Sequence, residues 1–445
     1  MTTSPALIGR QPFGPSLELE RYRLDNGLTV LLAIDRQAPV LSYETWFRVG
    51  ARHETKGKGG LAHLLEHLMF NETKNLPYGA FDRRLEEVGA ESNAATFLDW
   101  TYYMINAPSA AADLVIDLEN ERMQHLVLRD EQVASEREVV ANERLQTVDD
   151  DVDGTVGELL YRTAFERHGY GLPTIGTMAD IEGLRTADCR AFYDTYYAPN
   201  NATIVLVGDV DRDRVLERIA RSYGGIAAAT IPREEERTEP AQTAERRVGI
   251  EQPTATAKLA VGYKCPAMAD ADHPPLVLLA EILFGGRASR AHRELVQKLE
   301  VASEVGGQVG NFVCPSLFDI GLTARAGVSA TELLEALDRV IEPLLAAPPT
   351  EEELARAVMR FELATLQGMQ TVGGKAEQIG FSELVLGDPC ASMSRLEAMR
   401  TTTREDLARA AQRYLVPSGR TAVLVAPGEL GEPDEQDEPD EEEAA

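Results

Sequence analysis

The chain has 445 residues, which is too long for one hydrophobic core, so two or more domains are expected. It carries 44 Lys and Arg against 73 Asp and Glu, a net charge of −29, and removing the ten carboxylates of the last seventeen residues leaves about −19 (29 − 10). This acidity argues against nucleic acid or an anionic membrane as the main partner, because phosphate binding needs clusters of basic side chains.

The N-terminal part of the chain mixes strand and helix patterns. The segment "RYRLDNGLTVLLAIDR" (21–36) predicts a β-hairpin with Asn26-Gly27 at its turn, and "VLSYETWFRVG" (40–50) predicts another strand. After a Gly-Gly break, residues 61–70 have the pattern of a buried helix. "AATFLDWTYYMINA" (94–107) predicts a further strand, and 111–146 shows helical periodicity. Strands mixed with long helices predict an α+β domain.

The two halves of the chain end in the same pattern. The segment "DCRAFYDTYYAPNNATIVLVG" (188–208) aligns without a gap with "DLARAAQRYLVPSGRTAVLVA" (406–426), at an offset of 218 residues (406 − 188). Such a repeat predicts the tandem duplication of one α+β unit of about 200 residues. The predicted fold class is therefore α+β, with an antiparallel-rich sheet flanked by helices in each half.

Composition sets the expected domain limits. A polar segment with prolines predicts a linker, and the acidic, low-complexity C-terminus predicts a disordered tail. The predicted units are an N-terminal extension (1–17), a first α+β domain (18–226), the linker (227–247), a second α+β domain (248–428) and the tail (429–445).

The cysteines and the apolar runs predict the compartment. The four cysteines have no C-x-x-C spacing, which is typical of reduced thiols (Cys189, Cys265, Cys314 and Cys390). The N-terminus has no basic start followed by an apolar core, and no run approaches eighteen apolar residues. We therefore expect a cytoplasmic protein without membrane insertion.

The most specific pattern is "GGLAHLLEHLMF" (59–70), which contains H-x-x-E-H at His63, Glu66 and His67. Residues four apart lie on the same face of a helix, so the two imidazoles can bind one metal ion, and Glu66 can hold a water from the edge of that face. Without a metal, three polar groups among leucines would be costly to bury. This order is the inverzincin signature, which predicts a hydrolytic zinc site.

The motif "GGLAHLLEH" resembles the zinc peptidases of the pitrilysin, insulysin and mitochondrial processing peptidase superfamily. The resemblance spans nearly all of 18–426, through segments in the family's order: "VGARHETKGKGGLAH" (49–63), "ESNAATFLDWTYY" (91–103), "YGLPTIGTMADIEGL" (170–184) and "YYAPNNATIVLVGDV" (196–210). It implies two halves that close into a clam-like chamber, which admits peptides or unfolded segments and excludes folded proteins.

The resemblance also implies the roles of single residues. The family's third metal ligand is a glutamate about 76 residues after the motif, with another glutamate seven residues earlier; "ASEREVVANERL" (134–145) supplies these as Glu143 and Glu136. His63, His67 and Glu143 would bind Zn²⁺, Glu66 would accept the proton of the attacking water, and Glu136 would orient a ligand or the surroundings of the ion.

The resemblance assigns the "NAAT" segment to substrate binding. In the family this segment belongs to an edge strand that takes the substrate as an added β-strand. Asn93, Ala94 and Thr96 are therefore the candidate substrate-binding residues, although Asn93 taken alone is also a common turn residue.

The second half departs from the family at one segment. Members that act alone carry a segment such as R-E-L-R-E-K-R-G-L-A-Y, whose second-listed Arg and final Tyr bind the substrate near the metal. The corresponding "RELVQKLEVAS" (293–303) has Val296 and Ser303 at these positions. A homologous chain could supply the Arg/Tyr pair in a heterodimer, or Arg290 or Arg293 could substitute for it, or this alignment is displaced; a homodimer is a further alternative.

We therefore expect a zinc metalloendopeptidase that cleaves peptides or unfolded segments and works with a homologous subunit. The alternatives are a non-catalytic structural or assembly subunit of the same fold and a dedicated processing peptidase for one precursor. The complete set of His63, Glu66, His67 and Glu143 favours an enzyme over a subunit that has lost catalysis.

Overall fold

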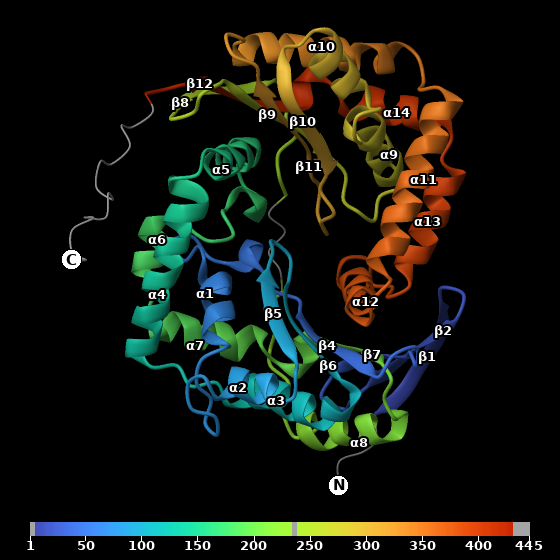
Figure 1. Cartoon of the computed structure of the whole chain (residues 1–445). Coiled ribbons are helices and arrows are strands. Elements are labelled where there is room, and N and C mark those ends of the chain that lie inside the picture. Colours follow the sequence, from blue (N-terminus) through green and yellow to red (C-terminus); the bar gives the residue numbers. More distant parts are fainter. Residues whose placement is uncertain (1–4, 234–237, 430–445) are drawn as a thin grey trace, which may run out of the picture.

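A computed structural model describes residues 5–233 and 238–429, and it contains two α+β halves that face each other (Figure 1). The first half holds a seven-stranded sheet, β1 (Ala6–Phe13), β2 (Leu17–Arg23), β3 (Thr29–Ile34), β4 (Val40–Phe47), β5 (Glu91–Thr96), β6 (Thr101–Pro108) and β7 (Ala202–Gly208). Its helices are α1 (Leu61–Leu68), α2 (Ala80–Glu86), α3 (Ala112–His125), α4 (Asp130–Arg144), α5 (Val152–Ala164), α6 (Met178–Gly183), α7 (Thr186–Tyr196) and α8 (Arg212–Tyr223).

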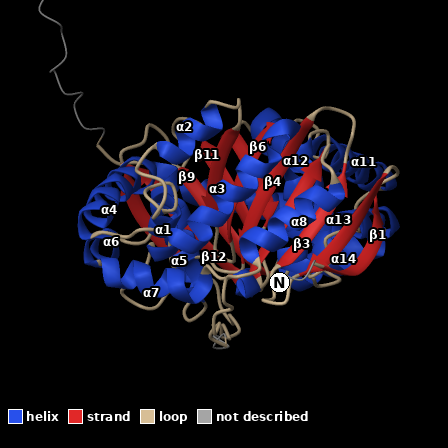
Figure 2. Ribbon diagram, turned by 90° about the horizontal axis from the view of Figure 1, so that it is seen from below, coloured by secondary structure: helices blue, strands red, loops and turns tan. Residues whose placement is uncertain are grey.

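The second half holds a five-stranded sheet, β8 (Arg246–Gln252), β9 (Lys258–Cys265), β10 (Ala302–Val309), β11 (Ser316–Ala324) and β12 (Arg420–Pro427). Its helices are α9 (His273–Phe284), α10 (Ala330–Ala346), α11 (Glu351–Gly368), α12 (Val372–Leu386), α13 (Ala391–Thr401) and α14 (Arg404–Tyr414). Helices cover the sheets, as Figure 2 shows from below. Within the described ranges, no helix is long and apolar enough to cross a membrane.

Both sheets are mostly antiparallel, as the sequence predicts. The strand order is β1-β2-β3-β7-β4-β6-β5 in the first sheet and β10-β11-β9-β12-β8 in the second. Each contains one parallel pair, β3 with β7 and β12 with β8. The order leaves β5 at an edge of the first sheet, where one side of its backbone has no neighbouring strand.

The predicted duplication is confirmed, because corresponding elements repeat at the same offset of 218 residues. Strand β4 (40–47) maps onto β9 (258–265), since 40 + 218 = 258, and α7 (186–196) maps onto α14 (404–414) in the same way. Helix α5, shifted by the same amount, falls on α12. The gap-free alignment of residues 188–208 with 406–426 thus reflects one α+β architecture that occurs twice in the chain.

Three elements differ in detail from the sequence prediction. Residues 94–107, predicted as one strand, form the end of β5, a turn and β6, because "FLDW" (97–100) makes the turn of a hairpin. The helical segment 111–146 is two helices, separated at residues 126–129. Strand β1 lies inside the predicted N-terminal extension (1–17) and pairs with β2, so the first sheet begins before residue 18. The predicted acidic tail (429–445) lies outside the described residues, apart from Glu429.

The halves exchange one helix each. Helix α5, which follows α4 in the first half, packs on the second sheet, where Leu160 and Val156 contact Leu317, Val423 and Val425 (Figure 1). Its counterpart α12 packs on strands β4 and β7 of the first sheet. Gly380 of α12 lies over Trp46 of β4, where an added Cβ would be 2.2 Å from the indole nitrogen. Each half therefore completes the core of the other.

Charged pairs fix α12 to the first sheet. The Lys375 ammonium is 2.6 Å from the carboxylate of Asp35, which is only 3% exposed, and Arg21 pairs with Glu383. Burying a carboxylate is tolerated only while its partner is present. These contacts hold the two halves in a fixed position relative to each other.

Removing the Lys375 ammonium should destabilise the fold. Lys375→Met leaves Asp35 buried without its cation, and we expect a loss of roughly 3 kcal/mol in the free energy of unfolding. The double variant Lys375→Met/Asp35→Asn should recover part of this loss. The control is Arg218→Met, which breaks the more exposed pair with Asp117 and should cost less than about 1 kcal/mol. Urea unfolding measures both, and equal losses would contradict the prediction.

Candidate metal centre

Helix α1 presents its histidines opposite a buried apolar face. Leu61, Leu64, Leu65 and Leu68 point into the core of the first half, while His63, Glu66 and His67 are partly buried on the other side. The helix begins after Gly60, whose φ of 82° favours glycine. A Cβ at Gly60 would also lie 2.3 Å from the Ile175 carbonyl oxygen. The Gly-Gly break predicted from the sequence therefore lets a neighbouring loop pack against the start of the helix.

Glu54 holds the first turn of α1, a role that the sequence analysis missed. Its buried carboxylate accepts hydrogen bonds from the backbone N–H groups of Gly60 (2.9 Å) and Ala62 (2.7 Å). These are among the N–H groups that a helix leaves without partners at its N-terminus. The sequence signal is weak, because Glu54 precedes the helix by several residues and no standard capping pattern has this spacing.

Replacing Glu54 should loosen α1. Glu54→Gln turns one carboxylate oxygen into an amide NH₂ group, which cannot accept from a backbone N–H, and we expect a loss of about 1–3 kcal/mol in the free energy of unfolding. Glu54→Asp should cost a similar amount, because the shorter side chain cannot span to both N–H groups. A chemical denaturation curve unchanged from that of the wild type would show that α1 does not depend on this contact.

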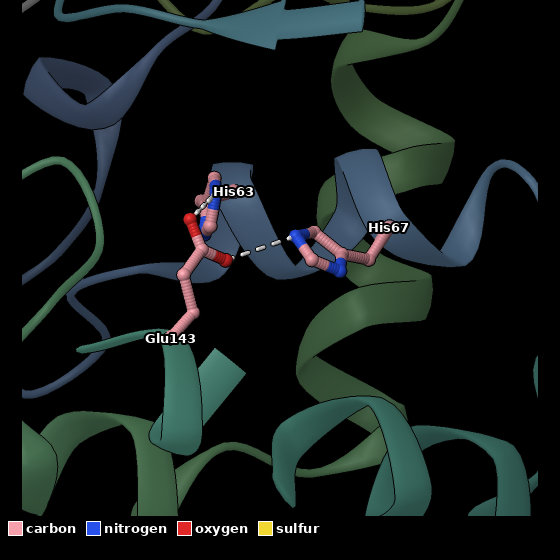
Figure 3. Close-up of side chains that lie close together, drawn as sticks. All are labelled: His63, His67 and Glu143. Atoms are coloured by element: carbon pink, nitrogen blue, oxygen red, sulfur yellow. Dashed lines mark ion pairs between the residues drawn. The ribbon is translucent and has the colours of Figure 1, made fainter. Parts of the chain in front are cut away.

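The structure brings His63, His67 and Glu143 together, as Figure 3 shows. Helix α1 carries the two imidazoles, and Glu143 reaches them from α4. The Nε2 atoms of His63 and His67 lie 3.6 and 3.4 Å from the two oxygens of the Glu143 carboxylate. One donor atom from each residue can be chosen so that all lie within 4.8 Å of one another.

These donors fit a zinc ion. Ligand atoms about 2.1 Å from an ion at tetrahedral corners lie about 3.4 Å apart. Each imidazole has one Glu143 oxygen at about this separation, although the two oxygens differ, and one donor atom from each residue can be chosen within 4.8 Å of the others. Two imidazoles and one carboxylate are a donor set that zinc uses in catalytic sites, with a fourth position left open. Glu131 and Glu138, which share α4 with Glu143, are not members of the cluster, and Glu143 is the predicted ligand that lies beside the two histidines.

The charge states of the cluster suit a cation. Burial, together with the neighbouring His67, lowers the pKa of His63 to about 4, so this imidazole is neutral at pH 7, the form that binds metals. Burial also acts to lower the pKa of His67, but the carboxylates of Glu136, Glu143 and Glu66 outweigh it and leave that pKa raised. These carboxylates therefore favour a positive charge at His67, close to where a metal ion would lie.

Glu136 lies behind His67 rather than in the ligand set. Its carboxylate is 3.5 Å from His67 Nδ1 and accepts a hydrogen bond of 3.0 Å from the amide of Asn71. The interaction with His67 lowers the pKa of Glu136. A carboxylate on the second imidazole nitrogen orients the ring and leaves Nε2 for the metal. Asn71, four residues after His67, was not identified from the sequence.

Glu66 faces strand β5 at the edge of the cluster. Its carboxylate accepts a hydrogen bond of 2.5 Å from the Thr96 hydroxyl, and burial raises its pKa. A raised carboxylate pKa suits a group that takes up a proton near neutral pH. Thr96 is one of the residues predicted to bind substrate. Its side chain is hydrogen-bonded to Glu66, while its backbone belongs to the edge strand β5.

The other predicted substrate residues lie on the same edge strand. Asn93 and Ala94 belong to β5, which pairs with β6 on one side only. The Asn93 side chain accepts a hydrogen bond from its neighbour, the Ala94 N–H, and does not reach the metal cluster. A pocket of about 330 Å³ opens beside Glu66 and His67, between α1, α2 and Glu136 of α4.

The segment with Val296 and Ser303 leads from a helical turn into the second sheet. A π-helical turn, η6 (His292–Lys298), is followed by Glu300 and then by strand β10. Glu300 has a φ of 54°, a conformation that favours glycine.

The groups near Val296 and Ser303 are engaged in local contacts. The Ser303 hydroxyl donates to the Thr323 carbonyl on the neighbouring strand. Arg290 forms two hydrogen bonds of 2.7 Å with the carboxylate of Glu353, and Arg293 lies 3.8 Å from the same carboxylate. These contacts disfavour Arg290 as a substitute for the missing arginine.

The chain matches two family models that divide it along its length. "Insulinase (Peptidase family M16)" matches residues 29–178, and "Peptidase M16 inactive domain" matches residues 184–361. The chain is 29% identical to "Zinc protease PqqE" of Helicobacter pylori over 92% of this chain and 93% of that protein. It is 25% identical to "Mitochondrial-processing peptidase subunit beta" of Blastocladiella emersonii, over 92% of this chain and 88% of the other.

A solved structure has the same fold over nearly the whole chain. It is titled a protease from Helicobacter pylori and superimposes with a TM-score of 0.88, at 29% identity, over 93% of this chain and 100% of that one. The first family model lies within the first half and contains His63, Glu66, His67 and Glu143, while the second begins near the end of the first half, before α7, and ends within α11. The chain therefore belongs to peptidase family M16, the superfamily of pitrilysin, insulysin and the mitochondrial processing peptidase.

Proposed function

We propose that this protein is a zinc-dependent metalloendopeptidase that cleaves peptides or unfolded segments. The observation that carries the proposal is the convergence of His63, His67 and Glu143 from two helices, with one donor atom of each within 4.8 Å of the others and with Glu66 on the same helix as the histidines. A subunit without catalysis would have no need for this arrangement. The names of its relatives agree with a protease.

Each residue of the proposed active site has a separate role. His63, His67 and Glu143 hold the zinc ion, which, when bound, lowers the pKa of water and polarises the scissile carbonyl. Glu66 takes the proton from the attacking water and passes it to the leaving amine, and burial prepares it by raising its pKa. Glu136 orients the His67 ring. The free edge of β5, at Asn93, Ala94 and Thr96, binds the peptide backbone as an added strand.

We infer that a second, homologous chain completes the active site. Family members that act alone have an Arg and a Tyr where this chain has Val296 and Ser303, and the local contacts of Arg290 and Ser303 leave the gap unfilled. The partner would supply the Arg/Tyr pair in a heterodimer; a homodimer would leave it missing from both chains. We further propose a cytoplasmic location, since the four cysteines have no C-x-x-C spacing and are far apart in the sequence.

A non-catalytic subunit is the second candidate, and the same gap at Val296 and Ser303 favours it. The two candidates are distinguished by zinc binding, which the peptidase requires and the non-catalytic subunit does not. A processing peptidase for one precursor differs from a general peptidase only in substrate range, which a panel of unrelated peptides would reveal.

Zinc should stabilise the folded chain. If zinc binds, adding it at about 1,000 times its dissociation constant should raise the free energy of unfolding by about 4 kcal/mol, because the ligands converge only in the folded state. His67→Asn should lose this increment, whereas His125→Asn, outside the cluster, should keep it. Metal analysis of the purified chain should find one zinc ion. A wild-type chain that neither contains nor responds to zinc would refute the proposed function.

A further inference from the structure

Arg144 occupies an unusual place next to the metal cluster. It follows Glu143 at the end of α4, and its side chain is 8% exposed. The guanidinium lies 2.9 Å from the carboxylate of Glu158 and 2.9 Å from that of Asp149, and it also donates to the Gly176 carbonyl. Successive residues of a helix point in different directions, so Glu143 faces the histidines while Arg144 faces the body of the protein.

Each of these contacts leads to a different element. Glu158 belongs to α5, the helix that the first half places on the second sheet. Gly176 belongs to the loop against the start of α1, where a Cβ at Gly176 would lie 2.4 Å from the Gly59 carbonyl oxygen. One guanidinium therefore joins the helix of Glu143 to α5 and, through the loop, to the helix of His63 and His67.

The connection between α4 and α5 is itself tightly packed. Helix α4 continues as a π-helical turn, η3 (Leu145–Asp149), in which the Thr147 hydroxyl donates to the Glu143 carbonyl at 2.8 Å. Gly154 of α5 lies against this turn, and a Cβ there would be 2.0 Å from the Thr147 carbonyl oxygen. Because Gly154 packs so closely against this turn, a shift of α5 would also move the end of α4.

We propose that Arg144 is a positioning residue of the metal site, and that the seating of α5 on the second half sets the position of Glu143 relative to His63 and His67. The second half thus acts on the metal site without contributing a ligand. The physical reason is that metal–ligand distances tolerate only about 0.2 Å, so a small displacement of α4 weakens binding. This inference rests on the proposed function, because it requires the cluster to bind zinc.

The test measures zinc affinity by competition with a chelator, on folded apoprotein and without an activity assay. Arg144→Gln and Glu158→Gln should each raise the zinc dissociation constant about tenfold. Arg144→Lys should recover part of the affinity, since it keeps the charge. Tyr161→Phe removes a hydrogen bond of 2.8 Å from α5 to Asp319 of the second sheet and should raise the dissociation constant about twofold.

The matched control is Asp272→Asn. It breaks the ion pairs of a buried carboxylate with Arg409 (3.3 Å) and Arg413 (2.7 Å) of α14, in a part of the second half whose described hydrogen bonds do not involve α5. Its stability should fall while its zinc affinity stays at the wild-type value. If Arg144→Gln does not fold, Glu158→Gln and Asp149→Asn decide the question.

Three outcomes would overturn the inference or part of it. Wild-type zinc affinity in folded Glu158→Gln and Arg144→Gln would overturn the positioning role of Arg144 and leave the proposed function intact. Wild-type affinity in Tyr161→Phe alone would overturn the link to the second half. A wild-type chain that binds no zinc at all would overturn the proposed function together with this inference.

Discussion

Glu66→Gln should lower the rate of peptide cleavage by about 10²–10⁴-fold while zinc remains bound, because general acid–base catalysis contributes rate factors of this size. Glutamine has nearly the shape of glutamate and can still accept the hydrogen bond from Thr96, which is 2.5 Å long in the wild type. It cannot take up the proton of an attacking water at neutral pH. The measurement is kcat on a quenched fluorescent peptide, together with the zinc content of the same sample.

The control for this variant is Glu138→Gln, which makes the same chemical change on an exposed side chain of α4 outside the cluster. It should cleave at the wild-type rate. If Glu66→Gln contains zinc and cleaves as fast as the wild type, Glu66 is not the group that accepts the proton. If it loses zinc, its effect on the rate says nothing about proton transfer, and the Glu66→Asp variant with zinc bound takes its place.

The purified chain alone should cleave peptides at least about 10²-fold less efficiently than a mixture with a homologous chain that carries the Arg/Tyr pair. Donors that stabilise the developing charge on a carbonyl oxygen commonly contribute factors of 10²–10³. This chain has a valine and a serine at those positions, and the Ser303 hydroxyl already donates to Thr323. The measurement is kcat/KM against the molar ratio of the two chains, which should reach its plateau at equal amounts.

Two mixed samples identify which chain supplies the Arg/Tyr pair and which supplies the zinc site. A partner whose Arg and Tyr are replaced by Ala and Phe should bind without activating. Wild-type partner with Glu66→Gln of this chain should also stay inactive, because the zinc site belongs to this chain. Full activity of this chain alone, in a sample shown to be monomeric by sedimentation, would refute the two-chain site; an Arg293→Gln variant would then test whether Arg293 substitutes for the missing arginine.

The juxtaposition of His63 and His67 could be predicted from the sequence because its determinants are local. Histidines at positions i and i+4 of a helix share one face whatever surrounds them, so the two imidazoles lie on the same face once the helix has formed. The apolar residues between them determine which face is buried. The duplication was visible because the strand and helix at the end of each half depend on short-range patterns repeated at one offset.

Long-range contacts were harder to foresee. Glu143 was selected among several glutamates of α4 by resemblance, and only its approach to the two histidines distinguishes it physically. Glu54 and Asn71 carry no sequence signal of their own, because their partners are a backbone N–H pair and a carboxylate on another helix. The hairpin at 94–107 has the sequence pattern of one strand, because the aromatic residues Phe97 and Trp100 continue the composition of the flanking strands through its turn.

The sequence by itself determined the helix with His63 and His67, the α+β class and the repeat, since each follows from the spacing of residue types along the chain. The tertiary structure alone decided that α5 and α12 change places between the halves and that Arg144 joins α5 to the end of α4. The two helices sit at equivalent positions of the repeat, and each could have packed on its own sheet. Which sheet a helix covers depends on the fit of its apolar face against residues hundreds of positions away, and no local pattern encodes that fit.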